Sequence, residues 1–156
     1  MPKEIQLSKL LQEKLINLQL KGKNKKEIIE ELVVLIAKSN RLKNKKAFLK
    51  SILEREKLGS TGIGNGVAIP HAKSKAVRDF VLVFARKDSG IDFGALDGER
   101  TYLFFSLASP EAEVGEHLKI LSEIARLIKD KFIVDNLKDC KTKKDVIRVL
   151  SLHGGK

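Results

Sequence analysis

The chain has 156 residues, of which 42% are hydrophobic and 33% charged, and this composition argues against a disordered or membrane-spanning protein. Its only cysteine, Cys140, has no intrachain partner, and the N-terminus lacks the apolar core of a signal peptide, so we expect a cytoplasmic location. The net charge of +11 would attract nucleic acid, but an aromatic content of 5% without tryptophan leaves few side chains for base stacking. Nucleic-acid binding is therefore disfavoured.

The first half of the chain predicts one strand and two helices. Residues 16–20 alternate between apolar and polar side chains, as in a strand with one polar face. Asn24 is a typical helix N-cap, and the apolar residues after it recur at spacings of three and four, which predicts a helix ending near Ser39. Asn44 opens a second helix in the same way, and Gly59 marks its end.

The second half predicts three strands and two helices. Residues 67–69 form a short strand, whereas residues 80–85 and 102–108 are continuous apolar runs, as in strands that are covered on both faces. A helix is predicted from about residue 116 to 129, and residues 142–145 form a capping-box-like start of a last helix. Helices and strands interleave, and no linker divides the chain. We therefore predict a single α/β domain, with a mixed, roughly five-stranded sheet and helices packed on its faces, over residues 1–156.

Several classes of site lack their sequence signatures. Neither G-x-x-x-x-G-K-[ST] nor G-x-G-x-x-G occurs, so the usual motifs of nucleotide binding are missing. Ser60 is followed by Thr-Gly and does not occupy a G-x-S-x-G motif, which disfavours a serine hydrolase. His71, His117 and His153 are far apart in sequence and Cys140 stands alone, so no metal site is expected.

Residues 59–71, GSTGIGNGVAIPH, place four of the eleven glycines just ahead of His71. Pro70 biases Ile69 towards extended structure, so the strand at 67–69 should stop and present His71 at its end, where the sites of α/β proteins gather. The glycines allow tight turns and could direct backbone N–H groups at an anion. On the residues alone, a tight connection followed by an exposed histidine is an equally good interpretation.

Three segments together resemble a known family. Residues 55–71 (REKLGSTGIGNGVAIPH) resemble the active-site segment of the fructose/mannitol/nitrogen-type enzyme IIA domains of the bacterial phosphoenolpyruvate-dependent sugar phosphotransferase system. Residues 91–98 (IDFGALDG) are similar to a loop between strands in that family, and residues 117–127 are similar to a later helix that begins with a second histidine. A long, ordered match is more specific than a glycine cluster.

The resemblance implies a phosphocarrier that needs no cofactor. His71 would accept a phosphoryl group from the phosphohistidine protein HPr, through Nε2, and pass it to a cysteine or histidine of an enzyme IIB domain. Arg55 and His117 match the family's other active-site residues. A guanidinium suits two phosphate oxygens, and a histidine near a helix N-terminus is expected to have a lowered pKa and to stay neutral. Without the resemblance, the simpler interpretation of Arg55 is a surface arginine at a helix C-terminus, and that of His117 is a solvated histidine at a helix start.

Other residues of the motif have weaker assignments. Ser60, Thr61 and Asn65 are candidates for binding in the loop, or they hold the glycines in place through bonds to the loop's own backbone. Glu56 is interpreted as a solvated helix residue. The lysine clusters lie away from the motif, so the net charge of +11 stays unexplained by the resemblance.

Two functions stay open at this stage. The first is a phosphotransferase component that feeds fructose- or mannitol-type sugar uptake. The second is a nitrogen-type regulatory protein whose phosphorylation state controls its binding to other proteins. Both predict phosphorylation of His71.

Overall fold

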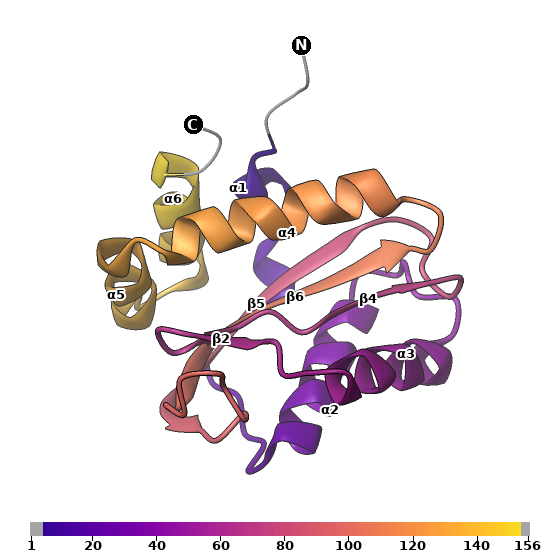
Figure 1. Cartoon of the computed structure of the whole chain (residues 1–156). Coiled ribbons are helices and arrows are strands. Elements are labelled where there is room, and N and C mark those ends of the chain that lie inside the picture. The colour runs from indigo at the N-terminus through magenta and orange to yellow at the C-terminus, as the bar shows by residue number, and fades with distance from the viewer. Residues whose placement is uncertain (1–4, 154–156) are drawn as a thin grey trace.

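The computed structural model describes residues 5–153, in which helices and strands interleave around one sheet (Figure 1). The helices are α1 (Leu7–Leu10), the 3₁₀ helix η1 (Glu13–Leu15), α2 (Lys25–Ala37), α3 (Lys45–Lys57), α4 (Val114–Ile128), α5 (Lys131–Asp139) and α6 (Lys143–His153). The strands are β1 (Ile16–Asn17), β2 (Gly62–Gly64), β3 (Val67–Ala68), β4 (His71–Ser74), β5 (Val81–Ile91) and β6 (Thr101–Pro110). None of the described helices is long and apolar enough to cross a membrane.

The sheet is mixed, as predicted, and has six strands in the described residues where we expected about five. Its order is β1-β5-β6-β3-β2, and β4 also pairs with β6. β5 and β6 are antiparallel, whereas β1 runs parallel to β5, and both β3 and β4 run parallel to β6. β2 was not predicted, because its sequence, Gly-Ile-Gly, shows no alternation of apolar and polar side chains.

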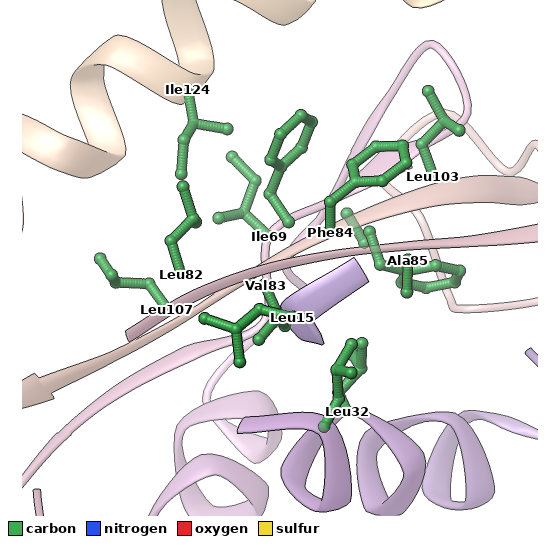
Figure 2. Packing of buried hydrophobic residues seen from close by; sticks show 14 of the residues in the cluster. Leu15, Leu32, Ile69, Leu82, Val83, Phe84, Ala85, Leu103, Leu107 and Ile124 are labelled. Carbon is green, nitrogen blue, oxygen red and sulfur yellow. The ribbon is translucent and has the colours of Figure 1, made fainter. Parts of the chain in front are cut away.

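Helices cover both faces of this sheet. Figure 1 shows α4 along one face, and α2 and α3 along the other. Figure 2 shows Ile124 of α4 above the strands and Leu32 of α2 below them, with Leu82 of β5 pointing towards α4. All three side chains are fully buried. Because β5 and β6 are covered on both faces, their sequences are continuously apolar where they pair most closely, which explains why they were predicted well.

The predicted helix starts agree with the hydrogen bonds. The Asn24 Oδ1 accepts from the backbone N of Glu27 at 2.9 Å, and the Asn44 Oδ1 accepts from that of Ala47 at 3.0 Å. At the last helix, the Thr142 Oγ1 accepts from the N of Asp145 at 3.1 Å. Each of these bonds satisfies a donor that the first turn of a helix leaves without an intrahelical partner.

Several boundaries differ from the predictions. The strand expected at 16–20 is limited to Ile16–Asn17, although the Leu20 N still donates to the Arg86 carbonyl at 2.9 Å. β5 continues to Ile91 through charged residues that end its apolar run, and α4 starts at Val114, two residues early. α5 was not predicted, because its nine residues are too few for a clear helical period.

Candidate active site

The first feature of the site is a break in a strand. β3 and β4 both pair with β6, with Ile69 and Pro70 between them. The Pro70 carbonyl accepts from the backbone N of Leu107 at 3.1 Å and from the Ser106 Oγ at 2.8 Å, so the break is held firmly against β6. The strand at 67–69 does stop before Pro70, as expected, but His71 does not simply follow its end: the chain resumes pairing along the same side of β6, and His71 is the first residue of β4.

The His71 ring is held in one tautomer. Its Nδ1 lies 2.6 Å from the Ile69 carbonyl oxygen. A carbonyl can only accept, so Nδ1 carries the proton and Nε2 keeps its lone pair. Burial lowers the pKa of His71, and the positive charge of Arg55 lowers it further, while the bond to Ile69 acts in the opposite direction. The ring is therefore neutral near pH 7, with the lone pair of Nε2 free to accept or to bond.

His117 reaches the same place from α4. Its ring centroid lies 5.5 Å from that of His71, with the planes inclined at 53°. The residue is buried, and its Nδ1 lies 2.7 Å from the Ser109 Oγ. Burial is the main cause that lowers the pKa of His117 to about 4, followed by the charges of His71 and Lys73. The pKa of His117 is lowered, as predicted. The main cause is burial of the ring, whereas we expected the helix N-terminus to lower it.

Arg55 completes a cluster drawn from three elements. It lies in the last turn of α3, as predicted, and its Nη1 donates to the Gly59 carbonyl at 3.1 Å. Arg55, His71 and His117 line one hollow of about 610 Å³ at the sheet edge formed by β4. In Figure 1 this edge lies between α3 and α4. The other lining residues are Ser51, Glu54, Leu58, Ala72, Lys73, Leu118 and Leu121.

Glu56 is not the solvated residue that we expected. Only 7% of it is exposed, and its carboxylate accepts from the Thr61 N at 2.8 Å and from the Thr61 Oγ1 at 2.7 Å. The Lys25 Nζ pairs with the same carboxylate at 2.8 Å and lies 4.7 Å from the centre of the Phe93 ring. Glu56 thus ties the end of α3 to the glycine-rich loop and to the start of α2.

The three loop candidates support the backbone. The Ser60 Oγ accepts from the Gly62 N at 3.0 Å and donates to a carbonyl, that of Phe93, at 3.1 Å, while Thr61 bonds to Glu56. Asn65 has a φ of 58° in the turn between β2 and β3, and its N donates to Asp97 at 3.3 Å. None of Ser60, Thr61 and Asn65 is among the residues that line the hollow.

Comparison with known proteins decides the family. Residues 9–152 match the family described as "Phosphoenolpyruvate-dependent sugar phosphotransferase system, EIIA 2". The chain belongs to this enzyme IIA family. The resemblance of the three segments is thereby confirmed, along with the α/β fold expected for the chain.

Relatives of this IIA chain include both sugar-specific PTS components and nitrogen regulatory proteins. The chain is 33% identical over 149 residues to the PTS system fructose-specific EIIABC component of Bacillus subtilis, which covers 96% of this chain but only 24% of that protein's length. It is 39% identical over 133 residues to a nitrogen regulatory protein of Bradyrhizobium diazoefficiens, over 85% of this chain and 86% of that protein.

Solved structures share the fold of this IIA chain. The crystal structure of nitrogen regulatory protein IIA-Ntr from Neisseria meningitidis matches with a TM-score of 0.86 and 33% identity, over 92% of this chain and 98% of that chain. A complex of enzyme IIA mannitol and phosphorylated enzyme IIB mannitol from Escherichia coli matches with a TM-score of 0.78 and 21% identity, over 92% of this chain and 100% of that chain. At that identity, the second match shows the fold alone.

Two residues of the candidate site were missed from the sequence. Lys73 is exposed and lines the hollow, two residues after His71 in β4. Because side chains in a strand alternate between faces, a strand starting at His71 would have placed Lys73 beside it, but no strand was predicted there. Ser109 lies fully buried behind His117. Nothing in the apolar run of β6 distinguishes it.

Proposed function

We propose that this IIA chain is a phosphocarrier in which His71 accepts a phosphoryl group on Nε2 and passes it on. The observation that carries the proposal is the bond from the His71 Nδ1 to the Ile69 carbonyl, which leaves Nε2 as the nucleophilic nitrogen beside Arg55 and His117. The proposed donor is the phosphohistidine protein HPr, and the proposed acceptor is an enzyme IIB domain of a fructose- or mannitol-type sugar uptake system in the cytoplasm.

The proposed transfer needs no proton movement at His71. The Nε2 lone pair forms a bond to phosphorus while the bond between phosphorus and the donor's ring nitrogen breaks, and its electron pair returns to that ring. The phosphorylated His71 ring keeps its Nδ1 proton and carries positive charge, which the Ile69 carbonyl stabilises. The reverse sequence of bonds delivers the group to the next acceptor, and a phosphoramidate is labile enough for this.

Charge on the phosphoryl oxygens is met by the neighbouring side chains. Arg55 offers a planar guanidinium, of which one N–H is already bonded to Gly59, and Lys73 adds a second cation at the hollow. The neutral ring of His117 offers one nitrogen for a hydrogen bond to the same phosphoryl oxygens. Phosphoryl transfer depends mostly on such positioning and charge compensation.

Phosphorylation in a reconstituted system tests this function. With phosphoenolpyruvate, enzyme I and HPr, we expect acid-labile phosphate to accumulate on the wild-type chain, and none on a folded His71→Ala variant. His153→Ala is the matched control, because His153 lies at the end of α6 and does not line the hollow. Acid-labile phosphate on the His71→Ala variant would contradict the proposal.

The nitrogen regulatory relatives favour a second function on the same chemistry. In that case the phosphorylated and unphosphorylated forms of the chain bind other proteins differently, and transfer onward is slow. Offering the phosphorylated chain to a fructose-type IIB domain separates the two: rapid transfer supports sugar uptake. Its absence, together with stable binding of a partner by one form only, supports regulation.

A further inference from the structure

The side-chain hydroxyl of Ser109 lies behind the second histidine and has a single hydrogen bond among the described residues. The residue is in β6, opposite Lys73 of β4, and its side chain is fully buried. Its Oγ lies 2.7 Å from the Nδ1 of His117 and has no other hydrogen-bond partner among residues 5–153. A serine hydroxyl has one proton to donate and two lone pairs, so the direction of this bond decides where the ring proton of His117 lies.

Two arrangements of that bond differ in cost. If the His117 Nδ1 carried the proton, Ser109 would accept, and its own buried hydroxyl proton would have no acceptor. If Ser109 donates, its proton is satisfied and only lone pairs are left over. A buried donor without a partner is costly, about 1–3 kcal/mol, so donation by Ser109 is favoured. Nδ1 is then the acceptor, and the proton of the neutral ring lies on Nε2.

The orientation of the proton matters for the site. An Nε2–H can donate to an oxygen of a phosphoryl group on His71, whose ring lies 5.5 Å away between centroids. An unprotonated Nε2 would turn a lone pair towards that oxygen and repel it. His117 is buried and its pKa is about 4, so it has no second proton near pH 7, and the position of the single proton decides its role.

We infer that Ser109 is a positioning residue that fixes His117 as the Nε2–H tautomer, so that His117 donates a hydrogen bond to the phosphoryl group carried by His71. This inference rests on the proposed phosphocarrier function. Ser109 itself lines no part of the hollow and acts only through His117. The pair is the counterpart of Ile69 and His71, in which a carbonyl fixes the opposite tautomer.

Nitrogen NMR of the unphosphorylated protein, labelled with ¹⁵N in histidine, tests the tautomer directly near pH 7. We expect the His117 Nε2 to show a one-bond coupling to hydrogen and the Nδ1 to show none. The His71 ring serves as an internal reference with the opposite pattern. A proton on the His117 Nδ1 in the wild-type chain would overturn the inference. This readout needs no phosphoryl chemistry, so it stands apart from the test of the proposed function.

Substitution of Ser109 tests whether the tautomer of His117 affects the phosphorylation of His71. In Ser109→Ala we expect the His117 Nε2–H form to lose its dominance and the rate of His71 phosphorylation to fall about tenfold or more, the scale of one hydrogen bond to a charged group. Ser109→Thr keeps the hydroxyl and should restore both. Thr101→Val is the matched control, because Thr101 is also buried in β6 and its Oγ1 has no partner among the described residues.

The rates and the tautomer together distinguish a positioning role of Ser109 from a packing role. Loss of rate in Ser109→Ala with an unchanged tautomer would overturn the inference and leave Ser109 with a packing role, as would an equal loss of rate in Thr101→Val. If the wild-type chain takes up no phosphate at all, the proposed function fails, and the tautomer of His117 still decides whether Ser109 orients that ring.

Discussion

At the scale of single residues, the site depends on what lies behind each histidine. A carbonyl behind His71 holds the proton on Nδ1, and a hydroxyl lies behind His117. Burial lowers the pKa of both rings, so both are neutral near pH 7. Two imidazoles of the same chemistry can therefore differ in role because their buried partners differ.

The low pKa of His117 predicts a loss of stability in acid. The unfolded chain binds a proton on this residue below its ordinary pKa of 6.5, whereas the folded chain does so only below about 4. The contribution is therefore complete above pH 6.5 and is lost as the pH falls towards 4. By linkage it amounts to about 3 kcal/mol of the free energy of unfolding.

Urea unfolding at several pH values measures this contribution. Carboxylates also titrate in this range, so the loss between neutral and acid pH is compared between the wild type and His117→Gln. We expect the wild type to lose more stability on acidification than the variant. Parallel pH profiles for the two proteins would show that His117 does not titrate as described.

The buried contacts of Glu56 next to the site predict that its removal destabilises the fold. Glu56→Ala leaves the Thr61 N–H and the Lys25 ammonium without their partner, so we expect a loss of about 2–4 kcal/mol in the free energy of unfolding. Glu54→Ala, on the exposed side of the same helix, should change it by less than about 0.5 kcal/mol. Chemical denaturation measures both, and equal effects would remove the distinction between them.

At the scale of elements, the site is assembled at the break between β3 and β4, the two strands that pair with the same side of β6. α3 brings Arg55, β4 brings His71 and α4 brings His117, so no element holds more than one of the three. The glycine-rich loop connects α3 to the sheet through a tight β2–β3 turn, in which Asn65 and Gly66 have φ values of 58° and 78°. Consecutive residues at positive φ form the turn that best matches the twist of a hairpin.

Two glycine substitutions test this use of backbone freedom. Gly66→Ala places a Cβ at positive φ and 3.2 Å from the Tyr102 ring, so we expect a loss of about 1–2 kcal/mol in stability. Gly115→Ala in α4 meets nothing within 4 Å and should stabilise the protein by about 0.5–1 kcal/mol. Thermal or urea unfolding measures both. Stabilisation by Gly66→Ala would contradict the conformation of the turn.

At the scale of the whole molecule, the charge is largely separate from the site. The net charge is +11, and most lysines of the three clusters (residues 21–26, 41–46 and 141–144) are exposed. Lys25 is an exception, because it pairs with the buried Glu56. Exposed charges of one sign repel each other in the compact state.

Salt dependence follows from that repulsion. Raising NaCl from low concentration to about 0.15 M shortens the screening length to about 8 Å, so we expect the Tm to rise as repulsion among the lysines weakens. The Lys25–Glu56 pair is half-buried and should be screened less. A Tm that falls over this range would mean that surface ion pairs, such as Arg126–Glu123, outweigh the repulsion.

The sequence alone determined the α/β class, the two helix starts at Asn24 and Asn44, the two central strands and the family, because these depend on local hydrogen bonding, apolar period and a contiguous motif. Tertiary structure decided the rest. Glu56 is polar in sequence and buried in the fold, and Ser109 meets His117 only because β6 packs against α4. Likewise, β4 exists because β6 supplies the pairing partner for residues 71–74 after the break at Pro70. Such contacts join residues distant in sequence, and no local pattern encodes them.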